Sequence, residues 1–172
     1  MRPTRASDTL VRVLGNVSTR GTLELDSPSS HLIALRNFVP GASGLGIVTV
    51  TNGALFEVGN VIEASQATAS RCTVTVSGVS TSPAQPSRLA VTGFGSLTRI
   101  GAAGTAVFDI RDGAEMTCAG TLAIGQGTTS NGVLRVRSAT ANRSRVGATG
   151  LTSLSGTGSG TGGVALLDVQ SG

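Results

Sequence analysis

Residues Phe108 to Val136 read FDIRDGAEMTCAGTLAIGQGTTSNGVLRV, and residues Val48 to Val76, sixty positions earlier, read VTVTNGALFEVGNVIEASQATASRCTVTV. Few residues are identical between the two stretches, but apolar residues recur at the same alternating positions, for example Val50 and Ile110. Alternation with a period of two is typical of half-buried β-strands. Because the pattern of burial is kept while identity is lost, the repeat indicates a structural unit.

Each sixty-residue unit contains a second, shorter repeat. Val48 recurs as Val74, 26 residues on, and Phe108 recurs as Leu134 at the same spacing, whereas the step from Val74 to Phe108 is 34 residues. These spacings predict pairs of coils, of which the longer carries the extra loop STSPAQPS or GTGSGTGG. Strands and turns without a helical period favour a β-helix over a propeller, whose blades need four antiparallel strands each.

The sequence therefore predicts an all-β fold, a parallel β-helix (β-solenoid) of about six to seven coils paired into repeats of about 60 residues. Each coil adds ~4.8 Å of height, the spacing of paired strands. We expect one continuous solenoid over 42–172, with units at about 44–103 and 104–162 and a third that begins at 163. Residues 1–41 are expected to form divergent N-terminal coils or a cap-like segment, in which GTLELDSP resembles a first coil.

The apolar positions that survive the repeat are predicted to face inward. They are Val48, Val50, Phe56, Val58, Ile62, Cys72, Val74, Val76, Phe108, Ile110, Met116, Cys118, Leu122, Ile124, Leu134 and Val136. Because both cysteines lie in this phase, we expect buried thiols that act as small hydrophobes, and not a disulfide framework, a metal site or a nucleophile. The single histidine, His31, is expected at a strand edge or in a turn, and no cofactor is expected.

The stretch from Val91 to Val136 resembles the repeat of autotransporter passengers and of PEP-CTERM-associated surface proteins. Those repeats read V-T-G-x-G-S, then I-G, G-T followed by I-x-x-G-A, L-x-I-G and G-x-L-x-V. This chain supplies VTGFGS, IG, GTAVFDIRDGA, LAIG and GVLRV in that order. The resemblance covers about residues 42–172. It implies a right-handed parallel β-helix on a bacterial cell surface or outside the cell, and it supplies no catalytic residues.

Composition argues against several other classes. Only 13% of residues are charged and 39% are hydrophobic, which is unlike a disordered tail, and no run of eighteen apolar residues could span a membrane. The first fifteen residues carry no apolar core of a signal peptide. The net charge is +4, but nine acids are interspersed among thirteen arginines, and no Trp or Tyr is present to stack on bases. Nucleic acid is therefore not an expected partner.

A glycan-active enzyme is the main alternative, because β-helices host polysaccharide lyases and hydrolases. Glycoside hydrolysis needs two carboxylates across a cleft. Asp109 and Asp168 share a phase, but they are predicted to lie two coils apart, at ~10 Å, with Arg135 between them. Charge pairing between coils explains Asp109 better than catalysis does. An enzyme would instead bring Asp109, Asp112 and Glu115 together in one cleft.

Five arginines form the candidate binding site. They are Arg111, Arg135, Arg137, Arg143 and Arg145. The 26-residue spacing places Arg111 beside Arg137 on the next coil, and guanidinium groups bind sulfate, phosphate or carboxylate oxygens bidentately. The predicted ligand is an anionic glycan or a phosphate. The alternative is a solvated face in which Asp109 neutralises Arg135 and Asp112 neutralises Arg111.

These observations predict a non-enzymatic structural or adhesive β-solenoid segment of a bacterial surface or extracellular protein, a stalk or spacer. The alternatives are a glycan-active β-helix (polysaccharide lyase, hydrolase or phage depolymerase) and a self-assembling filament subunit. ALLDV, residues 165–169, begins a coil without a polar cap. The expected partners are therefore adjoining solenoid coils or another copy of the chain, end to end, together with host or environmental glycans.

Overall fold

The computed structural model describes residues 9–13, 17–19, 21–82, 84–138, 142–154 and 163–171. The regular secondary structure in these ranges consists of eighteen β-strands, which form three sheets of six. Every pairing between these strands is parallel. The all-β, parallel character predicted from the period-two pattern is confirmed.

Sheet A consists of β1 (Thr9–Val13), β4 (Ser30–Ala34), β7 (Leu55–Val58), β10 (Arg88–Val91), β13 (Glu115–Cys118) and β16 (Arg145–Ala148). Sheet B consists of β2 (Val17–Thr19), β5 (Phe38–Pro40), β8 (Val61–Ala64), β11 (Leu97–Ile100), β14 (Thr121–Ile124) and β17 (Thr152–Leu154). Sheet C consists of β3 (Thr22–Asp26), β6 (Leu45–Thr51), β9 (Arg71–Ser77), β12 (Thr105–Arg111), β15 (Asn131–Ser138) and β18 (Val164–Ser171).

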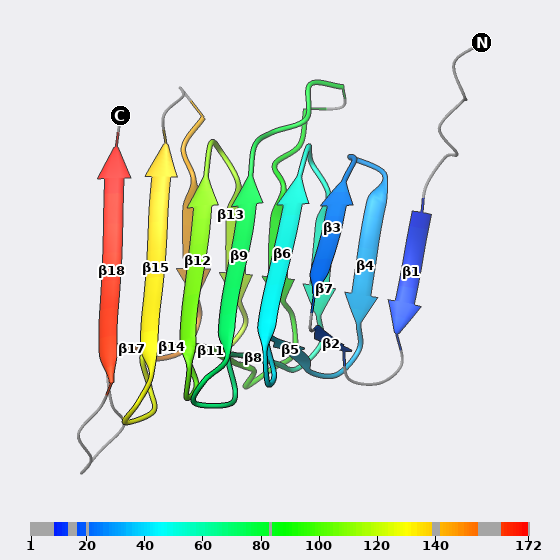
Figure 1. Cartoon of the computed structure of the whole chain (residues 1–172). Coiled ribbons are helices and arrows are strands. Elements are labelled where there is room, and N and C mark those ends of the chain that lie inside the picture. The colour runs from blue at the N-terminus through cyan, green and yellow to red at the C-terminus, as the bar shows by residue number, and fades with distance from the viewer. Residues whose placement is uncertain are drawn as a thin grey trace.

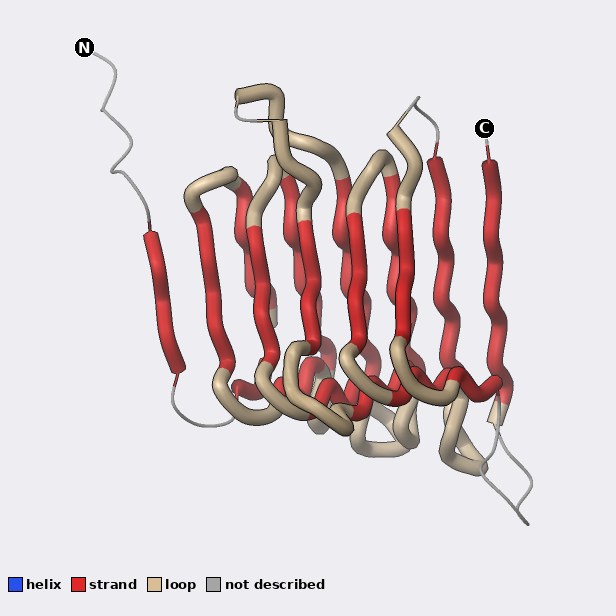
Figure 2. The backbone as a smooth tube through the Cα atoms, turned by 180° about the vertical axis from the view of Figure 1, so that it is seen from behind, coloured by secondary structure: helices blue, strands red, loops and turns tan. Residues whose placement is uncertain are grey.

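Successive triplets of strands contribute one strand to each sheet, so neighbours in a sheet are three elements apart along the chain. In Figure 1 the strands of sheet C run upward at the front, those of sheet A run downward behind them, and sheet B lies along the bottom. Figure 2 shows the same three-sided stack from behind, with loops at its corners. This is the arrangement of a parallel β-solenoid, with β1 and β18 at opposite ends of the stack.

The register of sheet C reproduces the spacings found in the sequence. Val48 of β6 lies beside Val74 of β9, Val74 lies beside Phe108 of β12, and Phe108 lies beside Leu134 of β15. The steps of 26, 34 and 26 residues are therefore steps from one strand to its neighbour. Residues 78–82 and 84–87, between β9 and β10, take up part of the longer step at the corner between sheets C and A.

The core lies between the three sheets, and the predicted inward positions are confirmed. Fifteen of the sixteen are buried, and Val136 is half-buried against the same core. Phe38 and Phe56 meet edge to face, with ring centroids 4.7 Å apart and planes at 74°. Three phenylalanines and many small aliphatic side chains thus fill the narrow interior.

The N-terminal residues within the described ranges continue the same sheets. Strand β3, which contains the predicted first-coil segment, pairs with β6, so that Leu23 lies beside Val48. His31 lies inside β4, and its ring is bonded across to the neighbouring strand. Sequence divergence in residues 9–40 is therefore compatible with the same strand pairing as in the later repeats.

Repeated turns join sheet C to sheet A. Asn52 and Asp112 adopt positive φ angles of 53° and 57°, and each is followed by a glycine with positive φ, Gly53 or Gly113. Asparagine, aspartate and glycine tolerate this left-handed conformation best. The Gly113 amide donates to the Ser144 hydroxyl at 3.1 Å, as the Gly53 amide donates to that of Ser87 at 2.9 Å. The NGA and DGA sequences therefore mark the same corner in the two repeats.

Replacing Ile110 tests the coil register. The side chain of Ile110 is fully buried, so Ile110→Ala is expected to lower the free energy of unfolding by about 2–5 kcal/mol, measured by denaturant titration. Ile47→Ala, on the outer face of β6 and 36% exposed, is the control and should cost much less. Equal losses for the two variants would contradict the register.

Candidate functional site: charged pairs on the outer faces

Strands β12 and β15 bring three of the five candidate arginines together on the outer face of sheet C. In the register of these strands, Asp109 lies beside Arg135 and Arg111 lies beside Arg137. The stacking of Arg111 and Arg137 is therefore as predicted. These residues alternate with the buried positions Phe108 and Ile110, so the inward phase of each strand determines that they face outward.

Asp109 forms its ion pair with Arg137 and not with Arg135. Arg137 Nε donates to Asp109 Oδ1 at 3.0 Å and its Nη2 donates to Oδ2, so the pair is bidentate. A long side chain can reach a diagonal neighbour on the adjacent strand, and the planar guanidinium thereby forms two hydrogen bonds with the carboxylate. The expectation that Asp109 neutralises Arg135 is wrong for this reason. The two hydrogen bonds from Arg137 and the nearby carboxylate charge raise the pKa of Arg137 above its ordinary value.

Arg111 sits near two carboxylates without a close pair to either. Its Nε lies 3.9 Å from Asp109 Oδ2 and 3.8 Å from Asp112 Oδ2. The predicted neutralisation by Asp112 is thus present but loose. Its side chain is 46% exposed, so Arg111 is the most accessible cation of the Asp109 group.

The structure does not bring the other two candidate arginines into this group. Arg145 begins β16 in sheet A, where it lies beside Glu115. Arg143 is exposed in the segment before β16. The five arginines are therefore split between two sheets and a connection, and they do not make one anion site. The sequence spacing placed residues 143 and 145 close along the chain but did not locate the corner between the sheets.

Sheet A carries two further side-chain pairs. His31 Nε2 lies 2.6 Å from Glu57 Oε2, between β4 and β7, and Arg88 Nε donates to Glu115 Oε2 at 3.0 Å, between β10 and β13. Glu115 therefore points away from Asp109 and Asp112, which both approach Arg111. The three acids do not converge in one cleft.

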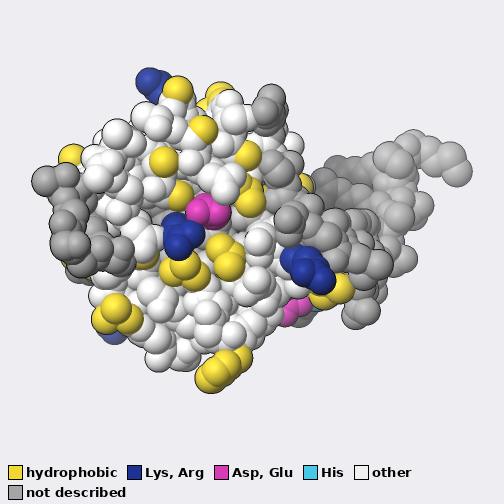
Figure 3. All heavy atoms as spheres, turned by 90° about the horizontal axis from the view of Figure 1, so that it is seen from below, with side chains coloured by type: hydrophobic (Ala, Val, Ile, Leu, Met, Phe, Trp, Pro, Cys, Tyr) yellow, Lys and Arg dark blue, Asp and Glu magenta, His cyan; other side chains and the backbone are white. Residues whose placement is uncertain are grey.

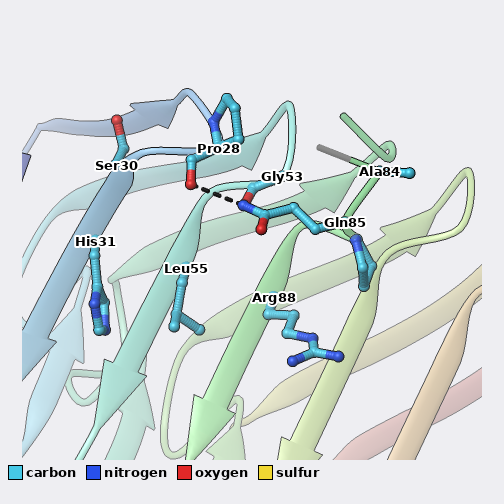
Figure 4. A pocket seen from close by; sticks show the side chains of 9 residues that line it. Pro28, Ser30, His31, Gly53, Leu55, Ala84, Gln85 and Arg88 are labelled. Atoms are coloured by element: carbon cyan, nitrogen blue, oxygen red, sulfur yellow. Dashed lines mark hydrogen bonds between the residues drawn. The ribbon is translucent and has the colours of Figure 1, made fainter. Parts of the chain in front are cut away.

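A groove lies on sheet A beside these pairs. Its volume is about 360 Å³, and Ala84, Gln85 and Pro86 of the loop between β9 and β10 line one side of it. Gln85 holds this loop down, because its Nε2 donates to the carbonyl oxygens of Pro28 and Gly53 at 2.7 Å each. Figure 4 shows His31, Leu55 and Arg88 on three neighbouring strands below Gln85. STSPAQPS was identified as an insertion, but its sequence gave no signal for where the loop docks.

Sheet B is the least charged of the three faces. Figure 3 shows this face as mostly white backbone and uncharged polar atoms with scattered hydrophobic side chains, and few charged ones. Arg99 of β11 donates to Glu63 of β8 at 2.8 Å and also to Gln126. This pair again joins two neighbouring strands.

The cysteines are free and buried, as predicted. Burial raises the pKa of the Cys72 thiol to about 12. Burial also raises the pKa of Cys118, and a hydrogen bond with Thr98 partly opposes that effect. Thiols with raised pKa values are poor nucleophiles and metal ligands at neutral pH. Among the described residues, no group of three or more His, Cys, Asp or Glu side chains is placed to hold a metal ion.

The chain matches no protein-family model, no curated protein and no solved structure. In the ranges that the structure describes, no helix is long and apolar enough to cross a membrane.

Removing the Asp109 charge tests whether the neighbouring arginines can bind anions. Asp109→Asn should leave Arg137 without its carboxylate, and affinity for a sulfated polysaccharide such as heparin should rise about three- to tenfold in a titration at low salt. The free energy of unfolding should fall by ~1–3 kcal/mol, because charge-assisted bonds are lost. Asp26→Asn, on β3 and bonded to Thr51 and Asn52 rather than to an arginine, changes the net charge equally and is the control. An equal rise in affinity for both variants would show that the change in net charge, and not the release of Arg137, causes the tighter binding.

The buried thiols predict an alkaline loss of stability. The Cys72 pKa is raised in the folded state, so the folded protein holds a proton that the unfolded chain releases, and stability falls as pH rises from about 9 to about 12. The expected loss is roughly 3–4 kcal/mol, measured by denaturant titration at each pH. The chain has no Lys or Tyr to titrate in that window. Cys72→Ala should reduce the slope, and Cys72→Ala combined with Cys118→Ala should remove most of it, because burial also raises the pKa of Cys118. An unchanged slope in Cys72→Ala would contradict the assignment.

Proposed function

We propose that this chain is a non-enzymatic structural or adhesive segment of a bacterial surface or extracellular protein, in which the solenoid serves as a stalk or spacer. The observation that carries the proposal is how the charged side chains are used. Three ion pairs among the described residues join neighbouring strands of a sheet, namely Arg88–Glu115, Arg99–Glu63 and Arg137–Asp109, and the hydrogen-bonded pair His31–Glu57 does the same. Acidic side chains that link one coil to the next have a structural role in the solenoid.

The handedness and coil number belong to the same proposal. We infer a right-handed β-helix of six to seven coils, because a right-handed connection between parallel strands is strongly preferred and because each sheet has six strands. A continuous core from Leu32 to Leu134 supports a rigid rod. The likeness of residues 91–136 to autotransporter and PEP-CTERM-associated repeats supports a location on or outside a bacterial cell.

Adhesion is proposed through outer faces and loops. Arg111, Arg135 and Arg137 on sheet C offer cations to anionic glycans, although Asp109 occupies part of their binding capacity. The Arg111 guanidinium is the group best placed to donate hydrogen bonds to sulfate or carboxylate oxygens. The proposed glycan contact is therefore weak and dependent on salt.

A glycan-active enzyme remains the second candidate, and the groove on sheet A is the observation that favours it. Glu57 contacts His31 at the edge of that groove, and Arg88 lines it. A carboxylate, an imidazole and a guanidinium near a hollow on the outer sheet are groups that glycan cleavage uses.

Turnover measurements separate the two candidates. The purified chain is incubated with neutral, uronate-containing and sulfated polysaccharides, and new reducing ends and unsaturated uronates are measured. The structural proposal predicts no product above a heat-denatured sample. Product that disappears in Glu57→Gln but persists in Glu63→Gln, an acid on sheet B that is also ion-paired, would establish the enzyme instead.

A further inference from the structure

Strand β18 forms one edge of sheet C. It has eight residues and pairs with β15 along its whole length on one side. In the sheet order of the described residues no strand follows it, and Figure 1 shows it as the last strand at the C-terminal end of the stack. Its outer edge therefore presents backbone N–H and C=O groups that can pair with another strand.

The core is also uncovered at this end. Leu167 and Val169 are 43% and 69% exposed, whereas Leu134, in the same row on β15, is 1% exposed. An apolar cavity of about 270 Å³ opens there, lined in part by Leu122 and Val136. A further strand with apolar residues beside Leu167 and Val169 would bury these side chains, as β15 buries those of β12.

The charges on the outer face of sheet C indicate which outward side chains a further strand beside β18 should carry. From β3 to β18, one row across the sheet reads Glu24, Thr49, Thr75, Asp109, Arg135 and Asp168. Arg135 lies between two carboxylates, and Asp168 is the final member. Opposite charges side by side across strands stabilise a sheet, and like charges destabilise it. The position beyond Asp168 therefore favours a basic residue.

A second copy of this chain fits that requirement poorly. If its β3 extended sheet C in the same phase, Leu23 would follow Leu167 in the apolar row, and Glu24 would follow Asp168. Both carboxylates lie on the outer face, where they would repel each other. Head-to-tail stacking of identical copies is thus opposed by one pair of acids.

We propose that the edge of β18 binds a parallel β-strand of a different polypeptide segment, apolar beside Leu167 and Val169 and with Arg or Lys beside Asp168. The chain itself contains a strand of this chemistry. Segment 131–138, NGVLRVRS, places Leu134, Arg135 and Val136 beside these three residues from the other side. The proposal rests on the proposed role of the chain as part of a longer stack, and it names the partner surface for that role.

The test uses the full chain and two labelled peptides. One is NGVLRVRS, and the other is NGVLEVRS, which differs only at the charged position. Fluorescence anisotropy at low salt should show the arginine peptide binding at least about threefold more tightly, with the difference shrinking at high salt. Asp168→Arg should reverse the preference. Asp26→Arg, the same charge change on the opposite edge strand, should not.

Failure of either peptide to bind would overturn docking on β18. Equal binding of both peptides, or a preference that Asp168→Arg leaves unchanged, would overturn the charge requirement. Neither result alters the turnover measurement, which does not involve Asp168, so the two proposals fail separately.

Sedimentation of the chain over a range of concentrations tests the second copy as the occupant. Glu24→Arg should associate more strongly than the unmodified chain at low salt, and Glu24→Arg combined with Asp168→Arg should return to the unmodified behaviour. Stronger association of the unmodified chain than of Glu24→Arg would overturn the proposal and make a second copy the partner.

Discussion

In-register pairing of parallel strands is the constraint on which the rest of this structure depends. Each inward side chain stacks on its counterpart in the next strand, as Val48, Val74, Phe108 and Leu134 do across four strands. A slip of one residue would move every apolar side chain of a strand to the outer face. The core therefore fixes the register, and the register in turn places every outward side chain beside a definite neighbour.

The corners preserve this register by leaving room for close backbone contacts. A Cβ atom on Gly120 would lie 2.0 Å from the carbonyl oxygen of Ser96 on the preceding coil, so the corner between β13 and β14 accepts no side chain. Ser65 is the instructive exception at another corner. It adopts a positive φ of 59°, and its buried hydroxyl donates to the Thr105 carbonyl at 2.6 Å, which offsets the cost of the conformation.

The sequence predicted what depends on periodicity and failed where side-chain reach or loop docking decides. The spacings of 26 and 34 residues and the inward set follow from alternation alone, because burial repeats even where identity does not. Arg137 pairs with Asp109 across a diagonal, a choice between two arginines of the same strand that spacing does not make. Gln85 anchors its loop because its side-chain amide donates to two carbonyl oxygens distant in the sequence, and no local sequence pattern predicts such contacts. For the same reason the sequence did not find the groove on sheet A.

Because the inward rows are fixed by packing, chemical variety in this solenoid is confined to its outward rows and loops. On sheet C the outward row changes from Thr49 and Thr75, which suit a strand through their β-branched shape, to Asp109, Arg135 and Asp168. Fully buried phenylalanines occur at positions 38, 56 and 108, and the row of Phe108 continues as Leu134 and then Leu167. This inward row stays apolar in the same strands, so the change to charged residues is confined to the outer face. A row of threonines places no charge requirement on the next strand, whereas a charged row favours a strand with the opposite charge. The C-terminal half of sheet C is therefore the part of the stack whose chemistry can select a neighbouring strand.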